Sequence, residues 1–415
     1  MVMASKLRAA SVAIDRLSAL RLFAVVAIPL FAIFLSTSSW SRGAVDIDGF
    51  TNVVTGWRIG TAGSVYLPEH TPLTHPDFVG HFSWIIAVDD TAIGKYPPGA
   101  ALHAAPVYAV WPQEAEMQTF AFENRPDIAP VRIPVPPYGP SAIVSSLVVA
   151  LAMGFLAISF RRFAGGLAAA GGAYVAGLGT SAWSVAADTL WQHGPGMMWI
   201  ALAGTLTAGH LAASGIAYGV ATLVRPLSAL IAASTGLSIA WQDRDWRPVA
   251  KVGLGAAAGL LTLMVYNTAV YGQVSVLGGY GSGFVEQTQS LDLIAYVRNV
   301  GLALVSTSRG VLIWSSFLVI LIPGIPTAWR AAPPWVRGGA LGGAIYLLVL
   351  LKANRYSGGG GFLAYRYPLE ALTAAAPLLF LSYAKWVAPR PRALRVFRWL
   401  AILSIAFHAL FAVRF

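Results

Sequence analysis

Apolar stretches close to the length of a membrane span recur along the whole chain. One nearly unbroken run extends from Leu22 to Ser36, and similar runs follow at intervals up to the C-terminus. A helix needs about 20 mostly apolar residues to cross the hydrocarbon core of a bilayer. The pattern therefore predicts an all-α, polytopic membrane protein.

The composition supports this class and excludes others. Hydrophobic residues make up 57% of the 415 residues and charged residues only 11%, whereas soluble domains carry about 25% charged residues. The net charge of +11 does not indicate a nucleic-acid partner, because the basic residues lie mostly in short clusters between apolar runs, as in cytoplasmic loops. The absence of cysteine excludes disulfides and thiolate metal ligands.

The apolar runs predict a single integral membrane domain over residues 1–415, with about eleven spans and no separate soluble domain. Between the spans, segments 39–139 and 272–309 are long. In the first segment, apolar residues at helical spacing from Phe50 to Ile59 predict an amphipathic helix on the membrane surface. The predicted spans are 21–38, 140–160, 164–182, 197–212, 214–224, 226–241, 252–271, 310–328, 338–352, 367–384 and 399–413.

Positive charge is distributed unequally between the predicted loops, and an excess of Lys and Arg marks the cytoplasmic side. The N-terminus is therefore expected in the cytoplasm, and segments 39–139 and 272–309 are expected on the outer side. The expected location is a bacterial plasma membrane, which the chain would cross several times. A composition rich in Arg, Ala and Gly is the basis for the bacterial origin. The basic clusters on the cytoplasmic side are 1–20, 161–162, 242–251, 330–337 and 385–398.

Residues 197–241 must cross an odd number of times to join the two sides. Forty-five residues are too many for one straight span, and Gly215 and Arg225-Pro226 divide them into short pieces. Proline breaks a helix and disfavours helical geometry in the residue before it. We therefore expect three short helices here.

Two acids follow the first predicted span, in Val45-Asp46-Ile47-Asp48-Gly49-Phe50. Ionisable groups so close to lipid usually serve a function. Two carboxylates at this position fit a general base, a metal ligand or a proton relay, and the spacing alone does not choose among these roles.

Cations occur at three other positions on the predicted outer side, at Lys95, Arg309 and Arg366. Lys95 stands in a stiff Tyr-Pro-Pro turn and is a point charge suited to a phosphate, although a helix-entry turn with a snorkelling lysine fits equally. Arg366 follows the run Gly358–Gly361, which would let the backbone approach an anion or would form a flexible loop. Together with the acids, these cations match what a transferase using a sugar phosphate needs: a base, and positive charge for the departing phosphate.

Two more polar residues lie beside predicted helix ends. His193, in Trp191-Gln192-His193-Gly194, fits a capped aromatic belt at the membrane interface or a residue that orients a carboxylate or binds a sugar hydroxyl. Arg225 has no acid nearby in the sequence. An arginine at membrane depth needs a partner or a cavity, so structural pairing and ligand contact are both open.

With these residues, the chain resembles the GT-C superfamily of polyprenyl-phosphate-sugar-dependent membrane glycosyltransferases. Members place an acidic motif in the first external loop, with an aspartate four residues before an aromatic residue, as in Asp46 to Phe50. Lys95-Tyr96-Pro97-Pro98-Gly99 is similar to a segment of the bacterial mannosyl, arabinosyl and aminoarabinose transferases. Other segments that resemble family motifs, in the family's order, are 190–194, 223–226, 267–272, 308–310 and 365–368.

The resemblance implies an inverting transfer of one sugar from a polyprenyl-phosphate carrier to an envelope glycan, lipid or protein on the extracytoplasmic face. Asp46 would be the base and Asp48 its helper. Lys95, Arg366 and Arg309 would bind the donor phosphate, and the sugar or acceptor pocket would include Tyr96, His193, Tyr365 and Glu370. No cofactor is expected, because cations are already at hand, although Asp46 and Asp48 with His193 are an alternative site for a divalent ion. The alternative function is transport or flipping of lipid-linked sugars, which would predict inverted repeats and charges near mid-bilayer.

Overall fold

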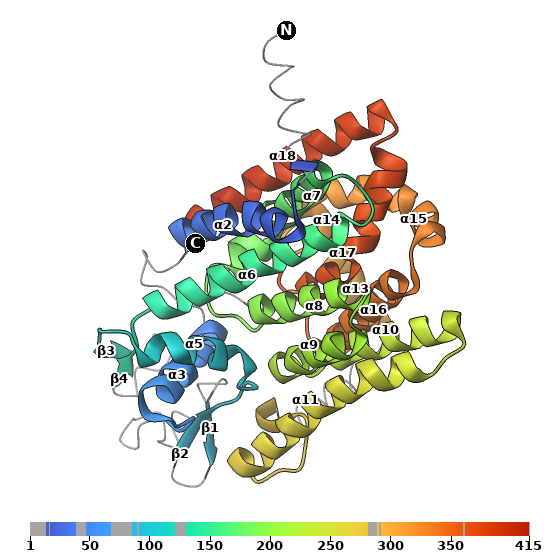
Figure 1. The fold of residues 1–415 in the computed structure, drawn as a ribbon. Coiled ribbons are helices and arrows are strands. Elements are labelled where there is room, and N and C mark those ends of the chain that lie inside the picture. Colours follow the sequence, from blue (N-terminus) through green and yellow to red (C-terminus); the bar gives the residue numbers. More distant parts are fainter. Residues whose placement is uncertain are drawn as a thin grey trace.

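In the computed structural model, the residues described are 14–15, 17–38, 47–67, 85–88, 91–120, 130–280, 289, 292–359 and 362–414. They are mostly helical, with two short β-hairpins. Figure 1 shows the long helices lying side by side in a slanted bundle, and the hairpins gather with two helices at one end of it. The prediction of a mostly helical fold is confirmed for these residues.

Five helices in the described part of the chain are long and apolar enough to cross a membrane, as expected for a membrane protein. The central one, α6, is the most deeply buried of the five, and its residues Val149 and Met153 share a core with Leu22 and Phe34 of the first. The five are α2 (Ala19–Thr37), α6 (Gly139–Phe160), α11 (Arg247–Tyr271), α16 (Pro334–Ala353) and α18 (Pro391–Arg414).

Shorter helices complete the bundle, and each predicted span coincides with a helix or with a run of short ones. The span expected over 310–328 is broken into three pieces, because Pro323 and Pro326 cannot donate backbone hydrogen bonds. The number of elements that cross a membrane stays a prediction. The shorter elements are α7 (Gly166–Leu178), η3 (Ala182–Ala186), α8 (His193–Thr207), α9 (Leu211–Val224), α10 (Ser228–Asp243), α14 (Val311–Trp314), η5 (Ser316–Gly324), α15 (Ile325–Ala331), α17 (Leu369–Ser382) and η6 (Tyr383–Val387).

The segment 197–241 forms three short helices, α8, α9 and α10, as expected. The second break falls at Arg225-Pro226, where the prediction placed it. The first falls at residues 208–210, and Gly215 lies inside α9 instead of ending a helix. The reason is helix packing, because Gly215 faces a neighbouring helix at a distance that leaves no room for a side chain.

Helices α9 and α11 cross through two facing pairs of glycines. Gly215 and Gly219 of α9 lie against Gly255 and Gly259 of α11, and a Cβ added at Gly255 would come within 2.1 Å of the Gly215 backbone. Glycines spaced by four residues let helix backbones approach closely in this way. The crossing fixes the direction of α9, and therefore the position of Arg225 at its C-terminal end.

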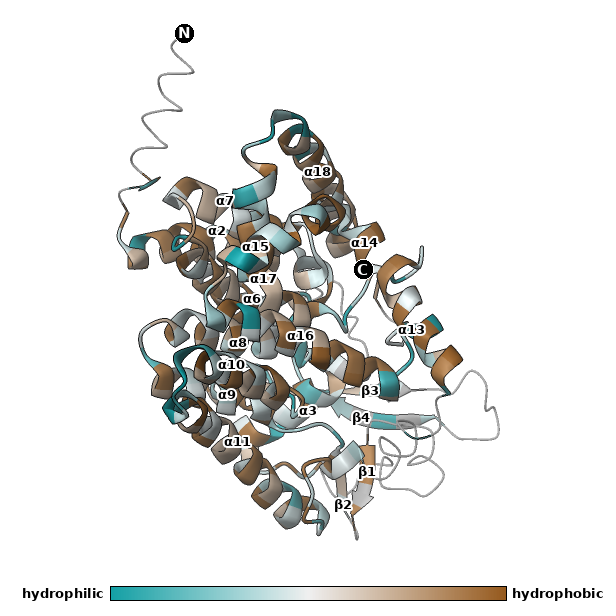
Figure 2. Ribbon diagram, turned by 90° about the vertical axis from the view of Figure 1, so that its right-hand side faces the viewer, coloured by the Kyte–Doolittle hydropathy of each residue, from teal (hydrophilic) through white to brown (hydrophobic). Residues whose placement is uncertain are grey.

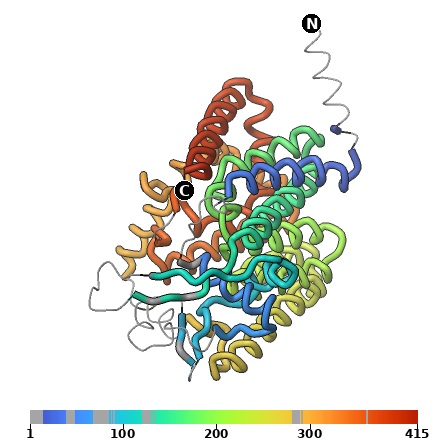
Figure 3. The backbone as a smooth tube through the Cα atoms, turned by 90° about the vertical axis from the view of Figure 1, so that its left-hand side faces the viewer, coloured from blue at the N-terminus to red at the C-terminus, as the bar shows by residue number. Residues whose placement is uncertain are grey.

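Two helices from the described part of segment 39–139 form a cap at one end of the bundle. Helix α3 (Ile47–Ala62) packs on α5 (Gly99–Ala109), and the residues Phe50, Val53 and Val54 are buried against the protein. A helix is present where one was predicted, and its place on a membrane surface stays a prediction. The hairpins were not anticipated, because strands this short carry little periodicity. Figure 3 shows both hairpins beside this cap and α18 on the far side of the bundle. The strands are β1 (Ile85–Val88) with β2 (Thr91–Gly94), and β3 (Glu116–Phe120) with β4 (Val131–Val135), both pairs antiparallel.

Segment 272–309 contributes the short turn η4 (Gly278–Tyr280) and the peripheral helix α13 (Leu293–Val305). The exposed residues of α13 are largely apolar and include Ile294 and Val297 beside Arg298, and Figure 2 shows α13 at the edge of the molecule. Its inner face is tied to α16 by Asn299, whose amide nitrogen donates to the Leu351 carbonyl at 2.6 Å. Such a helix, with its apolar face outward, fits contact with lipid.

Candidate functional site

A cavity of about 540 Å³ lies where several helix ends meet the cap. Among the described residues that line it there are three cations and no carboxylate. Nearly all of the lining comes from turns and helix termini, which is where a membrane bundle places polar side chains. The lining residues are Asn52, Lys95, Tyr96, Trp191, Gln192, His193, Arg225, Pro226, Leu227, Leu277, Gly279, Tyr280, Leu350, Asn354, Gly358, Gly359, Arg366 and Tyr367.

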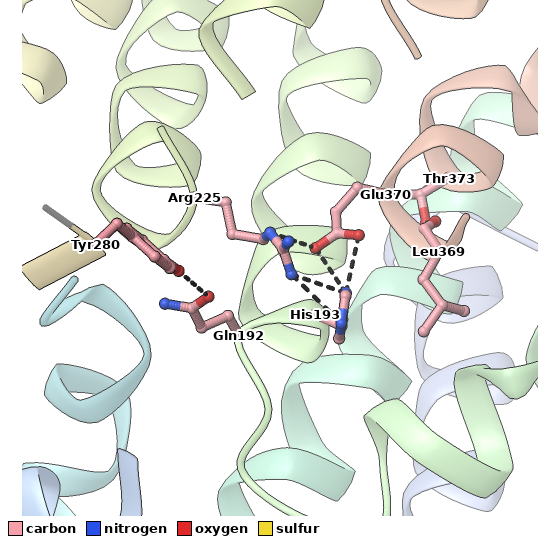
Figure 4. A network of polar contacts seen from close by, with 7 residues as sticks. All are labelled: Gln192, His193, Arg225, Tyr280, Leu369, Glu370 and Thr373. Carbon is pink, nitrogen blue, oxygen red and sulfur yellow. Dashed lines mark hydrogen bonds and ion pairs between the residues drawn. The ribbon is translucent and has the colours of Figure 1, made fainter. Parts of the chain in front are cut away.

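Arg225 and His193 in the cavity wall form a buried polar network with Glu370 behind it (Figure 4). The His193 Nδ1 atom lies 2.9 Å from both carboxylate oxygens of Glu370. The Arg225 Nε atom lies 3.3 Å from Glu370 Oε1, and its Nη1 lies 3.3 Å from His193 Nε2. Glu370 is fully buried, so this carboxylate is a counter-charge that holds Arg225 in place and not a group open to a ligand.

One tautomer of His193 satisfies these contacts. Its Nδ1–H donates to Glu370, and its Nε2 accepts a hydrogen bond from Arg225. Both ring nitrogens and the carboxylate are then engaged within the network. Neither His193 nor Glu370 is therefore placed to take a proton from a ligand.

The local sequence explains why these three residues meet. Arg225 is the residue after the end of α9, where Pro226 stops the helix from continuing. His193 is the first residue of α8, and Glu370 lies in the first turn of α17. Gly196, one turn into α8, packs against Glu370, and a Cβ there would lie in van der Waals contact with the Glu370 Cγ at 3.4 Å. Three helix ends thus converge on one point at the base of the cavity.

Two of the predicted phosphate ligands, Lys95 and Arg366, line this cavity. The guanidinium carbon of Arg366 lies 4.5 Å from the centroid of the Trp191 ring, and Lys95 Nζ lies 5.2 Å from that of Tyr96. Such cation–π contacts fix the direction of a cation. Gly358, with φ of +69°, packs within 3.0 Å of Arg366 at its Cβ position, which explains the glycine-rich sequence before α17.

The third predicted phosphate ligand, Arg309, does not line the cavity. Its guanidinium donates to the backbone carbonyls of Phe362, Ala364 and Gly359, so it braces the glycine-rich loop. Tyr365 is likewise buried away from the cavity, with its hydroxyl 2.6 Å from Ser315 Oγ. The sequence analysis assigned both residues to the same site as Arg366, but their side chains contact other groups.

Of the other residues predicted for the sugar or acceptor pocket, Tyr96 and His193 line the cavity and Glu370 lies behind it. The sequence reasoning did not select Asn52, Gln192, Tyr280 or Asn354, which line the cavity as well. For Gln192 a signal was present, since it belongs to the same short motif as His193. The sequence indicated that Arg225 needs a partner or a cavity, and in the structure its ion-pair partner is Glu370.

Asp46 lies outside the described residues, and so does the side chain of Asp48. The backbone of Asp48 belongs to the first turn of α3, four residues before Asn52, which lines the cavity. The roles predicted for both aspartates, as base and helper or as metal ligands, stay predictions.

The chain matches no family model and no curated protein. The resemblance to the GT-C superfamily therefore rests on the motifs quoted above.

Proposed function

We propose that this protein is a GT-C-type inverting glycosyltransferase that moves one sugar from a polyprenyl-phosphate carrier to an acceptor of the cell envelope. The observation that carries the proposal is the convergence of Lys95, Arg225 and Arg366 on one cavity. Among the described residues, Glu370 is the carboxylate that contacts one of these cations, and three cations that gather on one cavity suit an anionic ligand.

The charge of the site fits the chemistry of such a donor. A polyprenyl-phosphate sugar is a phosphodiester with one negative charge. As the acceptor oxygen attacks the anomeric carbon, the bond from that carbon to the phosphate oxygen breaks, and the electron pair leaves with the phosphate. The phosphate then gains a second negative charge, and cations already in position stabilise a charge that develops in the transition state.

The acceptor hydroxyl must lose its proton in this step, and we propose Asp46 as the base with Asp48 as its helper. The described lining contains no carboxylate, and Glu370 and His193 are engaged with Arg225. The two aspartates immediately precede or begin α3, the helix that brings Asn52 to the cavity. We expect no metal or other cofactor.

The proposed location is a bacterial plasma membrane, with about eleven crossing elements, the N-terminus in the cytoplasm and the cavity on the extracytoplasmic face. Its support is the unequal distribution of positive charge between the loops. Because the native chain has no cysteine, single-cysteine labelling tests this topology directly. Labelling of position 245 from outside the cell would contradict it.

The proposal is tested with purified protein, a panel of polyprenyl-phosphate sugars and simple acceptors. Asp46→Asn should abolish turnover and leave donor binding intact, since asparagine keeps the shape but cannot accept a proton, and Asp48→Asn should cost less. Glu114→Gln, at an exposed position on the cap, is the matched control and should be active. Binding without turnover by the wild type would favour the transport alternative, and a near-normal kcat in Asp46→Asn would exclude Asp46 as the base.

A further inference from the structure

Gln192 lines the cavity and has a side chain with one end held by Tyr280 and the other end buried. It is only 6% exposed and lies between Trp191 and His193 in the cavity wall. The Tyr280 hydroxyl donates a hydrogen bond to Gln192 Oε1 at 3.3 Å, as Figure 4 shows. The Nε2 atom of Gln192 has no hydrogen-bond partner among the described residues.

Tyr280 is itself firmly placed, so it can orient the amide. It ends η4, where Gly279 packs so closely on the Lys95 turn that a Cβ would lie 2.4 Å from the Lys95 carbonyl oxygen. Its ring also packs on Tyr96, with centroids 5.8 Å apart. The turn that carries Lys95 therefore also determines which way the Gln192 amide faces.

A buried amide donor without a hydrogen-bond partner destabilises the protein, because it has given up its bonds to water. A ligand oxygen that reaches this amide from the cavity, with a small turn of the side chain, would remove that cost. The amide is neutral, and cations for a phosphate stand elsewhere in the wall at Lys95, Arg225 and Arg366. A neutral donor is suited to a neutral acceptor, such as a hydroxyl or ring oxygen.

We propose that Gln192 recognises a hydroxyl or ring oxygen of the donor sugar and is a specificity-determining residue, positioned by Tyr280. The inference rests on the proposed function for the identity of the ligand. A site that hydrogen-bonds a substrate group discriminates strongly against analogues that lack it, because its buried donor is then left unpaired.

The experiment compares two ligands in each variant: the polyprenyl-phosphate pentose or hexose that binds the wild type most tightly, and the same polyprenyl phosphate without a sugar. Affinities follow from titration of tryptophan fluorescence, with Trp191 in the cavity wall. Gln192→Met should weaken binding of the sugar-bearing ligand roughly tenfold, which is the scale of one neutral hydrogen bond. The affinity for the bare phosphate should stay within about twofold of the wild-type value. Tyr280→Phe should give a smaller loss of the same selective kind.

Two controls separate this role from a structural one. Lys95→Met should weaken both ligands together, and Gln242→Met, at an exposed position at the end of α10, should change neither. Equal losses for both ligands in Gln192→Met, or no loss, would overturn the inference while the proposed function stands. Failure of the wild type to bind any of these ligands would overturn the proposed function, and with it this assignment.

Discussion

Two cavities formed by the described residues have similar sizes and opposite chemistry. The cationic cavity, of about 540 Å³, is lined by helix ends and turns that carry Lys95, Arg225 and Arg366. The apolar cavity, of about 450 Å³, is lined mostly by apolar residues of α6, α7, η5 and α17, and Thr180, Thr373 and Tyr383 are its polar lining residues. Size does not distinguish them, so the candidate site is identified by the charges that converge on it.

Helix α17 contributes to both regions from neighbouring positions. Leu369 lines the apolar cavity, and Glu370 joins the network behind the cationic one. Figure 4 shows the two side chains pointing in different directions. Consecutive residues of a helix face different sides, so one helix wall can separate a charged site from an apolar space.

The largest difference between the regions should appear when the buried network is broken. Glu370→Gln removes the charge that compensates Arg225, and an uncompensated buried charge costs about 3–5 kcal/mol. We expect a strongly lowered Tm in detergent. Glu114→Gln, which changes an exposed carboxylate, should stay within about 0.5 kcal/mol of the wild type.

A double variant sharpens this test. Arg225→Met with Glu370→Leu removes both charges, and replacing a buried ion pair by apolar residues is often nearly neutral. The double variant should therefore be more stable than Glu370→Gln alone. A wild-type Tm in Glu370→Gln would show that the network does not stabilise the fold.

Charge removal in the cationic cavity should affect ligand binding next most strongly. Lys95→Met and Arg366→Met should each weaken binding of polyprenyl phosphate by about 1.5–3 kcal/mol, the scale of a hydrogen bond to a charged group. Lys385→Met, at an exposed position in η6, is the matched control and should bind normally. Unchanged affinity in both cavity variants would remove these residues from the site.

The apolar cavity should respond to volume and not to charge. Gly171 and Gly172 are neighbours on α7, and both line it. A Cβ at Gly171 meets nothing within 4 Å, so Gly171→Ala should stabilise the helix by about 0.5–1 kcal/mol. A Cβ at Gly172 would lie 2.7 Å from the buried ring of Phe380, so Gly172→Ala should cost about 1–3 kcal/mol.

The measurement for this pair is the Tm, with polyprenyl-phosphate binding as the second readout. Neither variant should change that binding if the two cavities act independently. Altered affinity in Gly171→Ala would show that the apolar cavity belongs to the ligand site.

The smallest expected effect is a pH dependence of the Tm that arises from His103, on the cap side of the cationic cavity. The His103 Nε2 atom on α5 accepts a hydrogen bond from Trp199 Nε1 of α8 at 2.8 Å. Burial lowers the pKa of His103 below its ordinary 6.5, and the contact with the Gly99 carbonyl opposes this only in part. His103 therefore binds a proton more readily in the unfolded chain than in the folded protein. The folded protein has its full stability above pH 6.5 and loses part of it as the pH falls below that value.

We expect the Tm to fall by about 1–2 °C more in the wild type than in His103→Gln between pH 7 and pH 5, since 1 kcal/mol shifts the Tm of a domain of 150–250 residues by about 2–4 °C. Glutamine keeps a polar side chain that does not titrate. Equal acid sensitivity of the two proteins would rule out His103 as the titrating group.

The sequence by itself determined the class of fold and most of its helices. Apolar runs are a local property, so they identified the long helices and the three short ones over 197–241. The sequence also selected Lys95 and Arg366, because lysine beside prolines and arginine beside glycines are local signals too. The β-hairpins and the true break before α9 were missed, because short strands and helix crossings leave little local pattern.

Only the tertiary structure decided which polar residues meet. Arg225 needed a partner that the nearby sequence lacks, and it contacts His193, 32 residues away, and Glu370 beyond it. Arg309 and Arg366 look alike in sequence, but one braces backbone carbonyls and the other lines the cavity. The reason is physical: the direction of a side chain at a helix end depends on how the helices pack, and that packing arises from contacts between residues far apart in the chain.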